Sequence, residues 1–157
     1  ATTKPNTFRI ARSITISAPA SAIYPHLNNL KKFNAWSPWA KLDPESKAAF
    51  DGPEEGVGAK LSWEGKKTGK GSMTVAEINT NELVRYTMEF LKPMKATNTA
   101  EFTLKTQDNA TVVEWSIYGD NTYIRKIMSV LFNCDKMIGE QFEKGLADLK
   151  STVEKKS

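Results

Sequence analysis

Few side chains in this sequence have a type and a position suited to chemistry, and two of them fall within otherwise apolar faces. Tyr86 alternates with Val84 and Met88 in the run LVRYTMEFLKP, where a buried phenol could orient a ligand carbonyl or hydrogen-bond to a backbone carbonyl. Asp135 interrupts the apolar stripe of a C-terminal helical pattern, where its carboxyl group could transfer protons or pair with a basic side chain. Both residues are catalytic candidates, and both interpretations of each stay open.

The other reactive residues exclude several kinds of site. His26 is the only histidine and Cys134 the only cysteine, so a multi-histidine metal site, a zinc–thiolate site and an intramolecular disulfide are all excluded. His26 lies beside Ile23 and Leu27 at helical spacing and is expected at the surface. We expect no metal and no cofactor, and the lack of a recognisable catalytic motif favours a binding protein over an enzyme.

The stretch GKKTGKG invites comparison with a phosphate-binding loop. It has only three residues between Gly65 and Gly69, one fewer than that motif requires, and no serine or threonine follows Lys70. The runs on both sides have strand periodicity, so no helix N-terminus would face a phosphate. We predict a hairpin turn here.

Length and charge limit the possible partners. A chain of 157 residues is most simply one domain, spanning residues 1–157. The net charge of +4 comes from scattered lysines with acidic residues between them, and the dense basic stripe of a nucleic-acid-binding protein is missing. No apolar run reaches the length of a membrane span. The opening letters ATTKPNT, residues 1–7, are interpreted as the remnant of a linker.

Hydrophobic periodicity predicts one strand, two short helices, about six more strands and a long helix. Pro25 should kink or shorten the first helix, which follows Ser17, and a second helical turn is expected at 31–35. Apolar residues at spacings of three and four predict a final helix of about 30 residues, broken near Asn133. The strands are expected at 8–17, 47–52, 59–65, 72–78, 82–93, 99–106 and 110–119.

Two of the four tryptophans lie three residues apart in FNAWSPWAKLDP, between the early helices and the predicted sheet. Trp36 and Trp39 could be plugs that close the end of a core, or gates beside a cavity that the protein keeps open. Alanine at either position would distinguish these interpretations through its effects on stability and on ligand uptake.

This element order and several segments of the sequence resemble those of the START / polyketide cyclase-like (SRPBCC) superfamily and of one of its bacterial polyketide cyclase/dehydrase-like branches. These segments are RSITISAPASAIYPHL, WSPWAKLDP, GAKLSWEG, GKGSMTV, LVRYTMEFLKP, AEFTL, TVVEWSIYG and DKMIGEQFEKGLADLK. The resemblance implies an α+β helix-grip fold, in which a curved antiparallel sheet of six or seven strands wraps around the C-terminal helix. It also implies an apolar cavity between sheet and helix.

The resemblance places the pocket wall on the inward positions of the strands and on the long helix, with Trp36 and Trp39 near the entrance. Some members of this branch carry an N-terminal membrane anchor, so this protein is expected to be either cytoplasmic or tethered. The implied ligand-binding residues are Trp36, Trp39, Trp63, Met73, Val75, Tyr86, Met88, Phe90, Phe102, Trp115, Ile117, Met128, Leu131, Asp135 and Ile138.

The sequence leaves three possible functions open. The first is the binding of a small hydrophobic molecule such as a lipid, an isoprenoid or a polyketide-like ring. The second is a cyclase- or hydrolase-type enzyme acting on such a molecule, with Tyr86 and Asp135 moving protons. The third is a protein-interaction domain that acts on a chaperone or another macromolecule through its sheet face.

Overall fold

The computed structural model describes residues 7–92, 95–120 and 134–154. Within these residues, seven strands form one antiparallel sheet in the order β1-β7-β6-β5-β4-β3-β2. None of the described helices is long and apolar enough to cross a membrane. The strands are β1 (Thr7–Ile16), β2 (Lys47–Asp51), β3 (Lys60–Gly65), β4 (Gly69–Asn79), β5 (Leu83–Lys92), β6 (Ala96–Gln107) and β7 (Ala110–Asp120).

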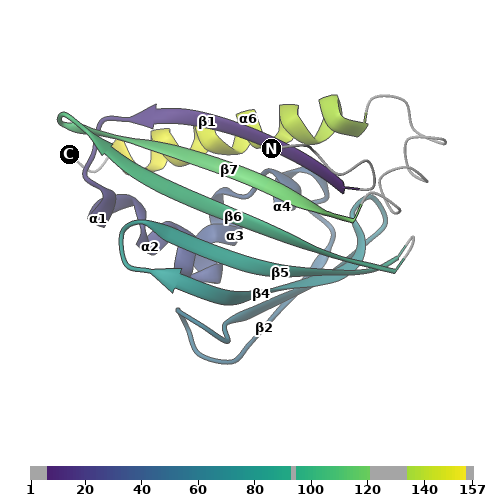
Figure 1. Cartoon of the computed structure of the whole chain (residues 1–157). Coiled ribbons are helices and arrows are strands. Elements are labelled where there is room, and N and C mark those ends of the chain that lie inside the picture. Colours follow the sequence, from purple (N-terminus) through teal and green to yellow (C-terminus); the bar gives the residue numbers. More distant parts are fainter. Residues whose placement is uncertain (1–6, 93–94, 121–133, 155–157) are drawn as a thin grey trace.

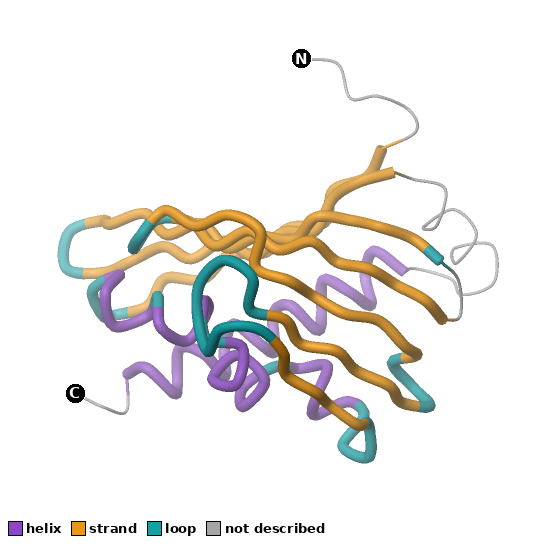
Figure 2. The backbone as a smooth tube through the Cα atoms, turned by 90° about the horizontal axis from the view of Figure 1, so that it is seen from below, coloured by secondary structure: helices purple, strands orange, loops and turns teal. Residues whose placement is uncertain are grey.

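The strands form where apolar and polar residues alternate, because a pleated strand directs successive side chains to opposite faces. On β5, Val84 and Tyr86 are buried while Glu89 is exposed. On β6 the buried positions run from Asn98 through Ala100 to Leu104. The helices therefore pack on one curved face, and the other face meets solvent (Figure 2). The expected curved antiparallel sheet of six or seven strands is confirmed, with seven strands.

Four short helices connect β1 to β2: α1 (Ala20–Ile23), α2 (Pro25–Asn28), α3 (Leu30–Trp36) and α4 (Pro38–Leu42). Helix α1 ends at Ile23 and Pro25 is the first residue of α2, so the first helix is short, as the position of Pro25 predicted. The side chain of Asn29 caps α3 by accepting hydrogen bonds from the amides of Lys31 and Lys32.

Helix α4 was not predicted, because the dipeptide Ser-Pro at its start is typical of a turn. Ser37 Oγ accepts a hydrogen bond of 3.2 Å from the Trp39 amide, and Pro38 occupies the first turn of α4, where its missing N–H costs nothing.

The C-terminal helix α6 (Cys134–Glu154) lies along β1 on the concave face of the sheet (Figures 1 and 2). The expected helix began earlier, and that part lies outside the described residues. Arg12 of β1 points toward α6 and pairs with Glu143 at 3.0 Å. A Cβ on Gly139 would lie 2.1 Å from the Arg12 guanidinium, so a larger residue there would displace the guanidinium from its present position.

Aromatic rings join the sheet to α6. Trp115 stacks on Phe142 with ring centroids 4.1 Å apart and an interplanar angle of 12°, and it stacks on Phe102 at 4.9 Å on its other side. Phe33 and Trp36 of α3 meet Trp115 edge-on at 6.0 and 5.5 Å. We call Phe102, Trp115 and Phe142 the ring stack. It fixes α6 and α3 over the middle of the sheet.

The convex face carries ion pairs instead of an apolar surface. Arg85 pairs with Glu77 and, at 2.9 Å, with Glu101, which also accepts a hydrogen bond of 2.6 Å from the Tyr118 hydroxyl. Partial burial opposes ionisation of Glu101, but Tyr118 and Arg85 outweigh it and hold the pKa of Glu101 below its ordinary value. Glu114 pairs with Arg9 at 2.9 Å.

The two neighbouring tryptophans should differ in their contribution to stability. Trp36 is 2% exposed and donates a hydrogen bond of 3.1 Å to the His26 carbonyl, so we expect Trp36→Ala to cost about 3–5 kcal/mol. Trp39 is only half-buried, and Trp39→Ala should cost about 1–2 kcal/mol. Urea unfolding followed by far-UV circular dichroism measures both. Equal costs would contradict this assignment of Trp36 to the core.

Candidate functional site

The concave face of the sheet is covered unevenly along its strands. Near the end where β5 passes to β6, on the right in Figure 1, four apolar side chains remain partly exposed: Trp63, Met88, Phe90 and Ile117. The register places Trp63 and Phe90 on either side of Gly71, and their rings lie 6.0 Å apart. We call these four residues, together with Asn98 beside Met88, the open end of the concave face.

The opposite part of the concave face, here called the closed end, is a packed core. Val75, Tyr86, Phe102 and Trp115 are at most 4% exposed, and short helices α1 to α3 cover them (Figure 1). Trp36 and Met73 are buried as well. The sequence assigned Val75, Tyr86, Phe102, Trp115 and Met73 to a pocket wall and Trp36 to its entrance. In the structure all six side chains pack against other side chains of the core.

Two residues of the helices complete the surroundings of the ring stack. The ring of Trp39 on α4 meets Phe142 edge-on at 6.4 Å, and Ile138 precedes Phe142 by about one turn of α6. Both are partly buried against the core. Of the other expected helix residues, Met128 and Leu131 lie outside the described residues. Asp135 belongs to α6, but its side chain is not among those described.

Tyr86 is engaged by the fold. Its hydroxyl donates a hydrogen bond of 2.5 Å to the Leu27 carbonyl at the closed end, and the residue is fully buried. Burial, with a smaller effect of Tyr24, raises the pKa of Tyr86 well above its ordinary value. Of the two interpretations left open for this phenol, the hydrogen bond to a backbone carbonyl is the one that the structure contains.

Asn98 is a polar residue of the concave face that sequence reasoning missed. It is 4% exposed, and its Oδ1 atom has no hydrogen-bond partner among the described residues. The sequence pattern could have indicated it. Ala100, Phe102 and Leu104 alternate on the inward face of the strand, and the same alternation places Asn98, two residues before Ala100, on that face. The expected strand began at residue 99, one position too late to include it.

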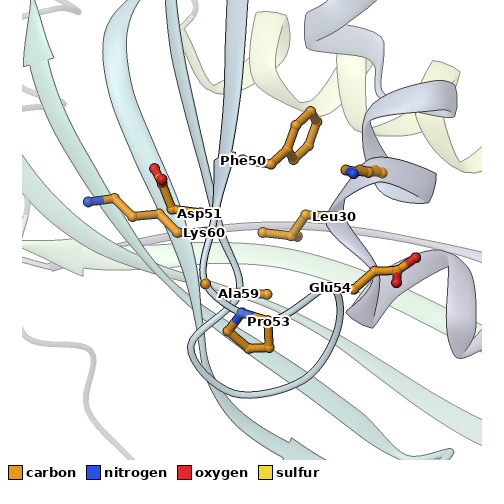
Figure 3. A pocket seen from close by; sticks show the side chains of 9 residues that line it. Leu30, Phe50, Asp51, Pro53, Glu54, Ala59 and Lys60 are labelled. Carbon is orange, nitrogen blue, oxygen red and sulfur yellow. The ribbon is translucent and has the colours of Figure 1, made fainter.

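Two surface hollows among the described residues lie away from the space between the sheet and α6. One, of about 230 Å³, lies between α3 and the β2–β3 turn, where Leu30 and Phe50 approach it from the two sides (Figure 3). The other, of about 300 Å³, runs along the outer side of β2 to β5 past Ser62, Ser72 and Glu89. No group of three potential metal ligands occurs in the described part of the chain.

Comparison with known proteins places these observations in a family. A family model described as "Polyketide cyclase / dehydrase and lipid transport" matches residues 7–154. None of the curated proteins matches the sequence.

Solved structures with the same fold have low sequence identity. Protein CV1439 from Chromobacterium violaceum is similar at 19% identity and a TM-score of 0.67, over 96% of this chain and 99% of that one. Protein MLL2253 from Mesorhizobium loti is similar at 12% identity and a TM-score of 0.70, over 96% and 99%. Ara h 8.0201 is similar at 11% identity and a TM-score of 0.64, over 95% and 99%. At these identities the likeness shows the fold alone.

The carboxylate of Asp43 connects α4 to the β3–β4 hairpin. Asp43 ends α4, and its Oδ2 atom accepts hydrogen bonds from the amides of Lys67 and Thr68 at 3.0 and 3.1 Å, and from the Thr68 hydroxyl at 3.1 Å. Lys67 and Thr68 form the tip of the β3–β4 hairpin, and the Thr68 carbonyl accepts a hydrogen bond of 3.3 Å from Trp63 Nε1. Asp43 therefore links the helix that carries Trp39 to the strand that carries Trp63.

This link predicts a pH-dependent contribution to stability. The Thr68 amide is the largest influence on Asp43, and with the Lys67 amide and the Thr68 hydroxyl it lowers the pKa of Asp43 despite burial. A depressed carboxyl pKa stabilises the folded state above the ordinary value of 3.8, and this contribution is lost as the pH falls through the folded-state pKa.

We therefore expect Asp43→Asn to lower Tm at pH 7, because the amide keeps the shape of the carboxylate but not its charge. The difference in Tm from the unsubstituted protein should shrink toward zero as the pH falls below about 3.8. Thermal unfolding at pH 7, 5 and 2.5 checks this. Asp51→Asn, at an exposed carboxylate of β2, serves as the control and should have little effect. A difference that stays constant down to pH 2.5 would contradict the prediction.

Proposed function

This chain belongs to the polyketide cyclase / dehydrase and lipid transport family of the START-like (SRPBCC) superfamily, and from that premise we propose that it binds a small hydrophobic molecule at the open end of its concave face. The family and fold are those of hydrophobic-ligand binding. The ligand class and the residues below are the parts that we propose.

The observation that carries the proposal is the unequal covering of one continuous apolar face. Buried apolar area is worth about 25 cal/mol per Å², so a folded chain usually covers such a face completely. At the closed end it does so. At the open end, Trp63, Met88 and Phe90 keep part of their surface uncovered, and a ligand that covers them gains the same free energy, less the cost of its own ordering.

The side chains of the open end suit an adaptable apolar site. Met88 is unbranched and polarizable, so it fits ligands of irregular outline. Trp63 and Phe90 present two aromatic rings at 6.0 Å in an edge-to-face arrangement, which favours planar or ring-containing ligands. A lipid, an isoprenoid or a polyketide-like ring all fit this chemistry, and the shape of the site selects among them.

The competing enzymatic function loses one of its two named residues, since Tyr86 is held by the Leu27 carbonyl. The other polar groups on the described part of the concave face include Asn98, Arg12 and Thr111. Arg12 is paired with Glu143, and the Thr111 hydroxyl donates a hydrogen bond to the Ala18 carbonyl. An amide does not titrate. The geometry therefore favours binding over acid–base catalysis.

Filling the open end tests the proposal. We expect Met88→Trp to weaken binding of the fluorescent probe 1-anilinonaphthalene-8-sulfonate by at least about tenfold, or about 1.4 kcal/mol, because the larger side chain takes the space of the ligand. Fluorescence titration gives the Kd. Native mass spectrometry of the unsubstituted protein should also detect a co-purifying apolar molecule.

Leu91→Trp is the matched control. Leu91 lies on the same strand, is 46% exposed and lines the outer hollow instead, so this substitution should leave the Kd of the probe within about twofold. Thermal unfolding of both variants verifies that they are folded. Equal Kd values for the probe in Met88→Trp and in the unsubstituted protein would refute the open end as the binding site.

A further inference from the structure

The two edges of the sheet differ in what covers them. β1 and β2 are the outer strands, and each has backbone groups that point away from its single neighbouring strand. On β1, the Thr15 carbonyl accepts a hydrogen bond of 3.1 Å from Lys150 of α6. The Ala11 carbonyl accepts one of 2.8 Å from the Arg12 side chain. Side chains therefore occupy the free edge of β1, along which α6 runs (Figure 1).

The free edge of β2 has no such cover within the described ranges. All five residues of Lys47–Asp51 are exposed, and no described residue outside the sheet hydrogen-bonds to their backbone. An open strand edge is a template for pairing with another strand, and proteins usually block it. The β2 edge is therefore a place where a further strand can add to the sheet.

The order of charges along β2 is complementary to itself. A second β2, added antiparallel and centred on Ala49, places Lys47 opposite Asp51 of the second copy, and Asp51 opposite Lys47 of that copy. Neither side chain forms an ion pair with another described residue. Charges on an edge strand usually discourage pairing, but opposite charges directly across two strands stabilise it. The pairing of two β2 strands thus gives both charges a partner.

The same register matches the apolar residues of β2. Ala48 and Phe50 alternate with the charged positions, so they lie on the other face of the strand, and Figure 3 shows Phe50 and Asp51 on opposite sides. Phe50 is 38% exposed and lies opposite buried Leu61 on β3. In the pairing, Phe50 lies opposite Ala48 of the second copy. Each ring then packs beside a small side chain and loses exposed apolar surface.

We propose that two copies of this chain associate through their β2 edges, antiparallel about a two-fold axis at Ala49, so that one sheet runs through both copies. Because both copies use the same edge and the β1 edge is covered, assembly stops at the dimer. Five residues from each copy make a small contact, in the class below about 1,200 Å² that transient complexes occupy. The dimer is therefore weak, with a Kd of about 10–100 µM, and it does not depend on the proposed ligand.

Two charge reversals test the register. Lys47→Asp places an aspartate opposite Asp51 of the second copy, and Asp51→Lys places a lysine opposite Lys47. By symmetry each substitution replaces two ion pairs by two like-charge contacts. Each variant alone should therefore dimerise at least about tenfold more weakly than the unsubstituted protein. Sedimentation velocity over concentrations that span the expected Kd measures this.

Mixing the two variants should restore the dimer. One copy then has aspartate at both ends of β2 and the other has lysine at both ends, so both ion pairs form again. The equimolar mixture should give a heterodimer whose Kd matches that of the unsubstituted homodimer to within about threefold. Damage to the fold of either variant would not be repaired by mixing, and far-UV circular dichroism of each verifies that it is folded.

Lys70→Asp is the matched control. Lys70 is exposed and, like Lys47, lies opposite Glu64, but it belongs to the inner strand β4. The same change of charge there should leave the Kd of the dimer within about twofold.

Two results would overturn the proposal. An unsubstituted protein that stays monomeric at about 1 mM would exclude a second copy as the occupant of the edge and leave it to a strand of another protein. A dimer whose Kd is the same in Lys47→Asp and Asp51→Lys as in the unsubstituted protein would place the contact on another surface.

Discussion

The stack of Phe102, Trp115 and Phe142 is the contact on which the arrangement of this protein depends. It joins two neighbouring strands to α6 through ring faces 4.9 and 4.1 Å apart, and α3 adds Phe33 and Trp36 at the edge of Trp115. Away from these rings, other elements have to cover the apolar side chains of the strands.

Among the described residues, the two sides of the concave face are covered to different degrees. Helices α1 to α3 bury Val75, Val84 and Tyr86 completely or nearly so, whereas Met88, Phe90 and Ile117 stay partly exposed on the same strands. The family model that matches the chain is described as "Polyketide cyclase / dehydrase and lipid transport", and the open end is the place that we propose for a hydrophobic ligand. Solved structures at 11–19% identity share the fold over nearly their full lengths.

Strand positions and facing directions could be predicted from the sequence, because both follow from a local period of two. The early end of α1 could also be predicted, because it depends only on the neighbouring Pro25. Which inward residues line a space could not be predicted, since that depends on what covers them. Tyr86 was a plausible ligand contact until Leu27, 59 residues earlier, was seen to hold it. Helix α4 was missed because its Ser-Pro start resembles a turn, and Asn98 was missed because a polar residue seemed to mark the end of the strand.

The close contact between Arg12 and Gly139 has a consequence for how β1 and α6 are joined. Glycine at position 139 leaves room for the Arg12 guanidinium against the helix, and Glu143, one turn further along α6, pairs with that guanidinium at 3.0 Å. A larger side chain at position 139 would displace the guanidinium from this place, so an ion pair between strand and helix depends on a residue that carries no charge of its own.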